Sequence, residues 1–147
     1  MATAFKIVSV ATGKAIGVPL SNRRPSGGLQ IYRDAGGADQ HWTLAPVAAN
    51  IFKIHPADSP LVLEVANAAV QNGAPIELSD DHGGQHQEWE IEPVGVTTFR
   101  VRSVRSGKVL DVPHSASADG TPIHQFTQND GANQHWTLVP VLESIIT

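Results

Sequence analysis

The tripeptide Gln40-His41-Trp42 returns as Gln87-Glu88-Trp89 and again as Gln134-His135-Trp136. The three tryptophans are 47 residues apart, a phenylalanine opens each copy at the same interval, and each copy closes on the dipeptide Pro-Val. Self-similarity at a fixed period is the mark of a repeat architecture. The sequence therefore consists of three gapless repeats, at residues 5–47, 52–94 and 99–141.

Each repeat is predicted to contain four short strands separated by turn residues. In the first repeat the strands are expected at residues 5–10, 14–18, 29–33 and 41–44, where the alternation of apolar and polar residues is bounded by Gly, Pro and Asn. Three such units exclude a helical solenoid, and a propeller needs about four blades or more. We expect an all-β chain that forms a single β-trefoil domain over residues 1–147, in which three hairpins cap one end of a six-stranded barrel.

The residues that recur in all three repeats are expected to build the barrel. Threefold equivalence favours packing over chemistry, because core layers must match where the repeats meet. We expect buried tryptophans whose indole N–H groups bond to the backbone, and apolar partners on one face of the first strand of each repeat. These residues are Trp42, Trp89 and Trp136, Phe5, Phe52 and Phe99, and Ile7, Ile54 and Val101. The repeated glutamines Gln40, Gln87 and Gln134 are expected to tie the loop backbone together, with a ligand-binding role secondary.

The composition and net charge of the chain argue against several classes of function. Hydrophobic residues make up 41% of the chain, charged residues 16%, and the net charge of −4 gives no support for nucleic-acid binding. The charge is uneven, at +3, −7 and +1 in the three repeats, so the repeats share a scaffold but not a surface. The absence of cysteine excludes disulfides and thiolate metal sites. Without a signal-peptide pattern or a membrane-spanning apolar stretch, we expect a cytoplasmic protein, or one released by a non-classical route, that does not insert into membranes.

Two aromatic residues are not needed by the repeated core. Six of the eight aromatic residues are the repeated Phe and Trp, which leaves Tyr32 and Phe126. These two occupy equivalent positions on the third strand of their repeats, where the second repeat has Ser79. Packing does not explain the pair, since the second repeat does without an aromatic. Function is expected where a shared scaffold carries different side chains.

Around Phe126, the third repeat has the kinds of side chain that a sugar-binding site needs. Asp111 supplies an acceptor-only carboxylate, and Asn133 and Gln134 supply amides that both donate and accept. Strand alternation places His124 and Phe126 on one face. A sugar offers vicinal hydroxyls to such a carboxylate and amide, and a patch of C–H groups that stacks on a flat ring.

This pattern resembles the ricin B-type lectins, including the small intracellular lectins of mushrooms. The motifs that carry the resemblance are Leu110-Asp111-Val112, Gly120-Thr121-Pro122-Ile123 and Asn133-Gln134-x-Trp136, together with the Gln-x-Trp repeats along the whole chain. The resemblance implies a lectin for glycans that contain galactose or N-acetylgalactosamine, without a cofactor, and a role in defence against animals that feed on the producer.

The resemblance also implies residue roles in the third repeat. Asp111 would hold two adjacent hydroxyls of the sugar, and Asn133 would bond a hydroxyl beside it. Phe126 would stack under the ring, and Gln134 would support Asp111. His124 stands where the family often has glutamine.

The other two repeats depart from this pattern. The first keeps Gln30, Tyr32 and Gln40 but has Gly17 in place of the key aspartate and Asp39 in place of the asparagine, so it is expected to supply at most a weak second site. The second repeat keeps the glutamine but lacks the aromatic residue and carries two acids in the remaining positions. We expect no sugar site there. Its residues at these positions are Glu64, Glu77, Ser79, His86 and Gln87.

The sequence gives little support to an enzyme or a metal-binding protein. No nucleophile elbow surrounds any serine, so we expect no enzymatic activity; the residues of a hydrolase-like set would be Asp111, His114, Ser115 and His124. We expect no metal site, because the second-repeat loop matches no known cage and is more typical of a solvated acidic loop; its candidate ligands would be Asp80, Asp81, His82 and His86. The alternative function is a β-trefoil protease inhibitor or protein-binding module that acts through exposed loops.

The number of sugar sites per chain bears on the expected oligomeric state. Weak single-sugar binding becomes useful through linked sites, and one good site per chain favours a homodimer that displays two. The tail at residues 142–147 follows the last repeat. We expect it to pack beside the N-terminal strand, where the barrel closes, with a dimer contact as the alternative.

Overall fold

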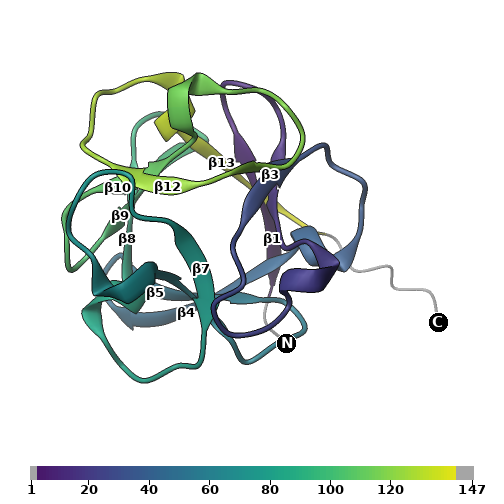
Figure 1. Cartoon of the computed structure of the whole chain (residues 1–147). Coiled ribbons are helices and arrows are strands. Elements are labelled where there is room, and N and C mark those ends of the chain that lie inside the picture. Colours follow the sequence, from purple (N-terminus) through teal and green to yellow (C-terminus); the bar gives the residue numbers. More distant parts are fainter. Residues whose placement is uncertain (1–2, 142–147) are drawn as a thin grey trace.

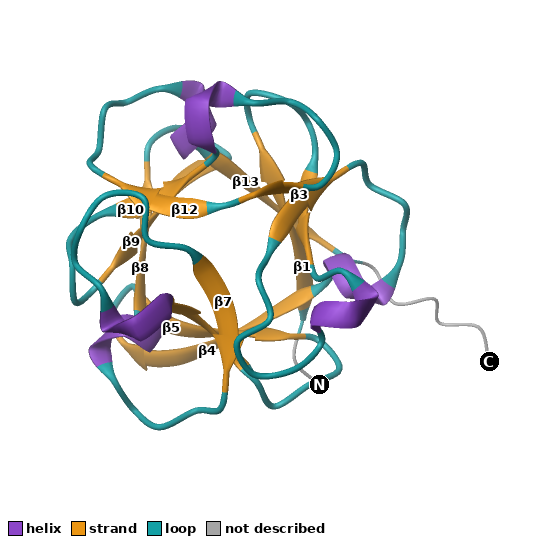
Figure 2. Cartoon of the chain, viewed as in Figure 1, coloured by secondary structure: helices purple, strands orange, loops and turns teal. Residues whose placement is uncertain are grey.

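The computed structural model describes residues 3–141 and consists of short strands joined by loops (Figures 1 and 2). The strands of the first repeat are β1 (Ala4–Ser9), β2 (Ala15–Gly17), β3 (Gln30–Tyr32) and β4 (Trp42–Ala48). Those of the second are β5 (Ile51–Pro56), β6 (Val62–Val65), β7 (Ile76–Ser79) and β8 (Trp89–Pro93). Those of the third are β9 (Thr98–Ser103), β10 (Val109–Asp111), β11 (Thr121–Pro122), β12 (His124–Phe126) and β13 (Trp136–Pro140).

Helical structure in the described residues is confined to short 3-10 turns. They are η1 (Leu20–Asn22), η2 (Ala38–Gln40), η3 (Ala66–Ala68), η4 (Gln85–Gln87), η5 (Pro113–Ser115) and η6 (Ala132–Gln134). None of the helices in residues 3–141 has the length and apolar character needed to cross a membrane.

Six of the strands pair in a closed ring. β1 pairs with β4, β4 with β5, β5 with β8, β8 with β9, β9 with β13 and β13 again with β1. A ring of paired strands leaves no free sheet edge, and this one is the barrel that the sequence predicts. The architecture is a β-trefoil, and the expected fold class is confirmed.

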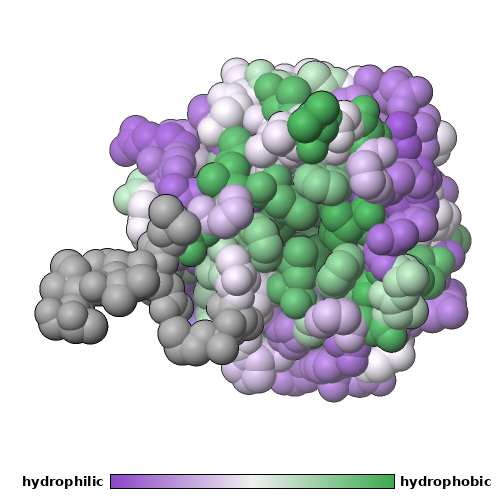
Figure 3. All heavy atoms as spheres, turned by 180° about the vertical axis from the view of Figure 1, so that it is seen from behind, coloured by the Kyte–Doolittle hydropathy of each residue, from purple (hydrophilic) through white to green (hydrophobic). Residues whose placement is uncertain are grey.

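Three hairpins cover one end of the barrel. They consist of β2 with β3, β6 with β7, and β10 with β12. Figure 1 shows the hairpin strands β3, β7 and β12 in front of the barrel strands. The opposite face carries a group of apolar side chains at its centre (Figure 3). The structure adds a thirteenth strand to the twelve expected, because β11 pairs with β3 and so joins the third hairpin to the first.

The tryptophans form the core as predicted. Trp42, Trp89 and Trp136 are fully buried. Their indole Nε1–H groups donate to the carbonyl oxygens of Ile16, Leu63 and Leu110, over 3.0, 2.9 and 3.3 Å. Each tryptophan on a barrel strand is thereby tied to the first strand of its own hairpin, which fixes the cap on the barrel.

The phenylalanines differ from the expectation that they are core residues. Phe5, Phe52 and Phe99 are only half-buried, whereas Ile7, Ile54 and Val101 are fully buried as predicted. The register gives the reason: Phe5 pairs with Trp42 of its own repeat and with Pro140 of the third repeat, near one end of the barrel. The phenylalanines therefore seal the junctions between repeats. The tail at residues 142–147, with its expected packing or dimer contact, lies outside the described residues.

Candidate functional site

The hairpin β10–β12 and the turn η6 bring the five candidate residues of the third repeat together. Asp111 ends β10 and pairs in register with His124 on β12. Phe126 lies two residues further along β12, and both side chains are half-buried, with ring centroids 5.6 Å apart. η6 carries Asn133 and Gln134 towards the same carboxylate.

The Asp111 carboxylate lies at the centre of this group. Only 3% of the residue is exposed. Its Oδ1 lies 2.6 Å from His124 Nε2. Its Oδ2 accepts from Asn133 Nδ2 over 3.2 Å and from Gln134 Nε2 over 2.9 Å. A buried carboxylate is costly unless it is hydrogen-bonded, and these three side chains stabilise it and fix its orientation.

Gln134 also holds the loop before it. Its Nε2 donates to the carbonyl oxygen of Thr127 over 2.9 Å, and its Oε1 accepts from the backbone N–H of Asn129 over 2.8 Å. Gln40 and Gln87 make the same pair of backbone contacts in their own repeats. The expected structural role of the repeated glutamines is confirmed, and contact with an acid is added where the repeat supplies one.

A surface hollow of about 380 Å³ opens above Asp111. Four of the five candidate residues line it, and Gln134 lies beneath, fully buried. Sequence reasoning did not place in it the backbone and side chains that come from neighbouring loops. The complete lining is Asn72, Gly73, Asp111, His114, Ser115, His124, Phe126, Asn129 and Asn133.

Asn72 and Gly73 are the notable additions, because they belong to the second repeat. Asn72 Oδ1 accepts from the backbone N–H of Thr127 over 2.8 Å and from its hydroxyl over 3.0 Å. Gly73 N–H donates to the carbonyl oxygen of Gln125 over 2.8 Å. The loop between β6 and β7 is thus bonded to the far end of β12 and forms one wall of the hollow. No repeat-by-repeat comparison of the sequence gives this neighbour.

The residues of the hydrolase-like set also meet at the hollow. Asp111, His114, Ser115 and His124 all line it. His114 and Ser115 lie in η5 with left-handed backbone angles, φ 54° and 52°. Asn67 and Ala68 repeat those angles in the second repeat, so the turn belongs to the scaffold. Among these four residues, the described part of the chain has one side-chain contact, between His124 Nε2 and Asp111 Oδ1.

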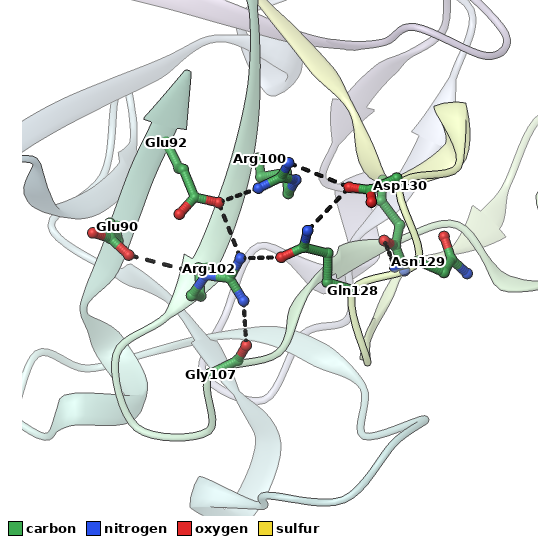
Figure 4. A network of polar contacts seen from close by, with 9 residues as sticks. Glu90, Glu92, Arg100, Arg102, Gly107, Gln128, Asn129 and Asp130 are labelled. Atoms are coloured by element: carbon green, nitrogen blue, oxygen red, sulfur yellow. Dashed lines mark hydrogen bonds and ion pairs between the residues drawn. The ribbon is translucent and has the colours of Figure 1, made fainter. Parts of the chain in front are cut away.

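A polar network braces the outer side of the site (Figure 4). Arg102 on β9 bonds to Glu92 on β8 over 3.0 Å and to the side chain of Gln128. Arg100 lies 3.3 Å from Asp130. Gln128 and Asp130 flank Asn129, whose side chain lines the hollow. The β8–β9 hairpin of the barrel therefore holds the loop that precedes η6.

The first repeat lacks the central carboxylate. Gly17 pairs in register with Gln30, at the place of Asp111 and His124. Asp39 lies beside Gly17, since a Cβ on that glycine would be 3.8 Å from Asp39 Oδ2. Gln40 is buried, and its amide forms hydrogen bonds with backbone atoms, among them one from Nε2 to the carbonyl oxygen of Tyr32. The four candidate residues Gln30, Tyr32, Asp39 and Gln40 lie on one hairpin and its following turn, as expected, without a buried acid between them.

The second repeat places two acids face to face. Glu64 on β6 pairs in register with Glu77 on β7 and is 5% exposed. Its Oε1 accepts from Gln87 Nε2 over 3.0 Å and lies 3.2 Å from His86 Nε2. Burial, and then the neighbouring Glu64 carboxyl, raises the pKa of Glu77 to about 7. This position therefore differs from its third-repeat equivalent in charge, in shape and in the absence of an aromatic ring.

Comparison with known families gives one clear match. The profile of the family described as ricin-type beta-trefoil lectin domain-like matches residues 2–79 and 85–145. No curated protein sequence matches the chain significantly.

Solved structures share the fold over nearly the whole chain. A designed protein with threefold symmetry, ThreeFoil, is 29% identical with a TM-score of 0.91, over 94% of this chain and 99% of that one. An exo-β-1,3-galactanase from Clostridium thermocellum is 28% identical with a TM-score of 0.86, over 95% of this chain and 30% of the enzyme. The ricin B-like lectin of Macrolepiota procera, solved in complex with lactose, is 21% identical with a TM-score of 0.79, over 92% of this chain and 94% of that one.

Proposed function

Because the chain belongs to the family of ricin-type β-trefoil lectin-like domains, we propose that it binds carbohydrate through the hollow above Asp111. The proposed ligands are glycans with a terminal galactose or N-acetylgalactosamine. The protein acts by recognition, and no bond of the sugar is made or broken.

One observation carries this proposal: a buried carboxylate is oriented by three side chains at the base of an open hollow. An ionised carboxylate has about four acceptor sites, and the protein uses three of them on Asp111. The remaining site of Oδ1 is available to a hydroxyl of a ligand. Asn133 adds an amide beside it, which can serve a second, adjacent hydroxyl.

Phe126 supplies the apolar part of the recognition. Its ring lies at the hollow beside the His124 imidazole and is half-buried, which leaves part of it to a ligand. A sugar whose hydroxyls lie on one side presents C–H groups on the other, and these pack on an aromatic face. Galactose fits such a site because its axial 4-hydroxyl neighbours the 3-hydroxyl while its opposite face is apolar. The lactose complex of the Macrolepiota procera lectin, whose fold is the same, supports this choice of sugar.

Binding of a single sugar by such a site is expected to be weak. A dissociation constant near 1 mM corresponds to only about −4 kcal/mol. Linked sites would turn it into avidity, and we therefore propose a homodimer that displays two third-repeat sites. Light scattering gives the mass of the assembly, and a titration gives the number of sites per chain. A monomer with one site per chain would contradict the dimer and leave the sugar site intact.

The test of the function is calorimetry with lactose, galactose and N-acetylgalactosamine, beside glucose as the control that lacks the axial 4-hydroxyl. We expect saturable binding of lactose, galactose and N-acetylgalactosamine, and no detectable binding of glucose. A glycan array extends the search, and a panel of proteases run beside it tests the inhibitor alternative. An array without any bound glycan, together with inhibition of a protease, would overturn the proposal.

A further inference from the structure

We propose that Glu64, His82 and His86 form a binding site for a divalent transition-metal ion of the Zn²⁺ class in the second repeat. The donor atoms are one carboxylate oxygen and one nitrogen of each imidazole, and all three lie within 4.8 Å of one another. In residues 3–141 these are the residues that gather three potential ligand atoms so closely. The site is separate from the proposed sugar site and does not depend on it.

The distances from Glu64 to the two histidines are close to the spacing that a tetrahedral ion requires. Glu64 Oε1 lies 3.2 Å from His86 Nε2 and 3.8 Å from His82 Nε2. Zinc bonds of about 2.0–2.1 Å to nitrogen and oxygen place neighbouring ligand atoms about 3.3–3.4 Å apart. The two imidazole rings also face the same region, with centroids 5.0 Å apart and planes tilted by 37°. Small side-chain shifts are enough to enclose an ion.

The scaffold holds the carboxylate in place. Glu64 lies on β6 and is almost fully buried. Gln87 Nε2 donates to Glu64 Oε1 over 3.0 Å, which occupies one of the two lone pairs of that oxygen. The same oxygen is the one nearest to both histidines. A hydrogen bond from a neighbouring group orients a ligand and tunes its affinity for the ion.

Gly84 makes room for the two rings. A Cβ at this position would lie 2.4 Å from His86 Cε1 and 3.4 Å from His82 Cε1. Its backbone angles, φ −73° and ψ 151°, are open to any residue. Gly37 and Gly131 approach Asp39 and Asn133 in the same way, so this glycine belongs to the shared turn. In the second repeat the residue it admits is His86, which an alanine at position 84 would displace.

Charge in the second repeat favours a cation. This repeat has a net charge of −7, whereas the first and third are positive. Asp81, a candidate from the sequence, is engaged elsewhere: its carboxylate bonds to Lys53 Nζ over 2.9 and 3.1 Å. The buried Glu64 takes its place, at the register position that Asp111 holds in the third repeat.

The donor set indicates the class of ion and its use. Imidazole suits Zn²⁺, Cu²⁺ and Ni²⁺, and two imidazoles with one carboxylate do not resemble the oxygen cages of Ca²⁺ or Mg²⁺. Three protein ligands leave a position for water or an external ligand. The exposed side of the site is formed by His82, whose side chain is 55% exposed, so an ion enters from solvent.

The experiment is a calorimetric titration of the full chain, without an affinity tag, with ZnCl₂. We expect one saturable site per chain. His82→Ala and Glu64→Gln should each weaken Zn²⁺ binding at least tenfold, and Gly84→Ala should weaken it by a similar factor. His82 is exposed and Glu64→Gln conserves shape and a hydrogen-bonding group, so both variants are expected to fold.

Two controls test whether the effect belongs to this site. Asp80→Asn removes a charge from the same loop, and His114→Ala removes a histidine from the third repeat; neither should change the affinity for Zn²⁺ by more than about twofold. The absence of a saturable site, or equal weakening by the controls, would overturn the metal site. Lactose binding by His82→Ala should remain at the wild-type level, so that failure of the metal site and failure of the sugar site are read separately.

Discussion

The second and third repeats share the same hairpin but carry different functional side chains on it. In both, the first hairpin strand carries a buried acid, Glu64 or Asp111, and in both the repeated glutamine donates to that acid. At the surrounding positions that differ between the repeats, the third repeat has His124, Asn133 and Phe126. The second has two histidines and a second acid that pairs with the first. A carboxylate held by glutamine is therefore a common base, and the neighbouring positions decide what it can bind.

The comparison also explains why the aromatic residue matters. Phe126 and Ser79 are equivalent, yet both hairpins form with the same pairing. The ring is not needed to build the strand, so its presence points to a ligand. The same reasoning applies to His82, which is exposed and contributes nothing to the core.

The largest expected effect comes from the acid itself. Asp111→Ala should weaken lactose binding by about 1.5–3 kcal/mol, since it removes hydrogen bonds between the ligand and a charged group. Binding then falls below what calorimetry detects for a weak monovalent sugar. Glu64→Gln, at the matching register position, should leave lactose binding unchanged. Equal losses in both variants would show that the acids support the fold rather than a third-repeat site.

Exchange of the residues at positions 126 and 79 tests whether the aromatic ring confers sugar binding on the third repeat. Phe126→Ser gives the third repeat the residue of the second, and should weaken lactose binding by about 1–2 kcal/mol through lost stacking and apolar contact. The reciprocal Ser79→Phe should not create a second site, because Glu77 and His86 still occupy the positions of His124 and Asn133. Two sites per chain in Ser79→Phe, counted by titration, would contradict this account.

The paired acids of the second repeat predict a pH effect on stability. The pKa of Glu77 is raised to about 7 in the folded protein, above its ordinary value of 4.5. The folded state therefore binds the Glu77 proton more tightly than the unfolded state does, and protonation of Glu77 stabilises the fold. This contribution to the free energy of unfolding is fully present below pH 4.5 and is lost as the pH rises to about 7.

Glu77→Gln removes that dependence. The free energy of unfolding of the variant, relative to wild type, should rise between pH 4.5 and 7 by about 1 kcal/mol, reduced from the full linkage value because solvent screens the pair. Denaturant unfolding of both proteins across this range measures it. A constant difference would mean that burial and the Glu64 carboxyl do not raise the pKa of Glu77 in the folded state.

The smallest effect is expected at the border between the repeats. Asn72 belongs to the second repeat but lines the hollow of the third, and its Oδ1 is held by Thr127. Because Oδ1 is engaged, the amide N–H₂ group is the part of Asn72 that we expect to donate to a ligand, so Asn72→Ala should weaken lactose binding by about 0.5–1 kcal/mol. Gln71→Ala, one residue away and also exposed, is the control and should have no effect. A stronger loss in Gln71→Ala would assign the effect to the loop as a whole.

Much of the fold could be predicted because the same core residues recur at the same spacing in all three repeats. The constant spacing of the tryptophans requires equivalent layers, and the ring of six strands with Trp42, Trp89 and Trp136 at its centre follows. The half-buried phenylalanines were not predicted. Their environment depends on pairing with the preceding repeat, and in the case of Phe5 with the last one.

The candidate site was predictable where its residues are close along one hairpin. Asp111, His124, Phe126, Asn133 and Gln134 converge as the register requires. Asn72 and Gly73 were missed because the contact between neighbouring hairpins leaves no periodic mark in the sequence. The sequence favoured a solvated acidic loop over a metal site, because its candidate ligands Asp80, Asp81, His82 and His86 match no known cage when only neighbours in the chain are considered. In the fold, the hairpin pairing brings Glu64 to the histidines, and Lys53 engages Asp81.

The pairing of β1 with β13 makes the molecule circular in structure although it is linear in sequence. The backbone N–H of Val141 bonds to the carbonyl oxygen of Ala4 over 2.8 Å, so the first and last described strands adjoin. Every repeat meets the next through one kind of junction, and the junction between the third and the first has the same form as the other two. Circular permutation should therefore be tolerated: a chain that begins at the exposed turn around Val96, with Thr3 and Val141 joined by a short linker, should refold to the same barrel with the third repeat leading.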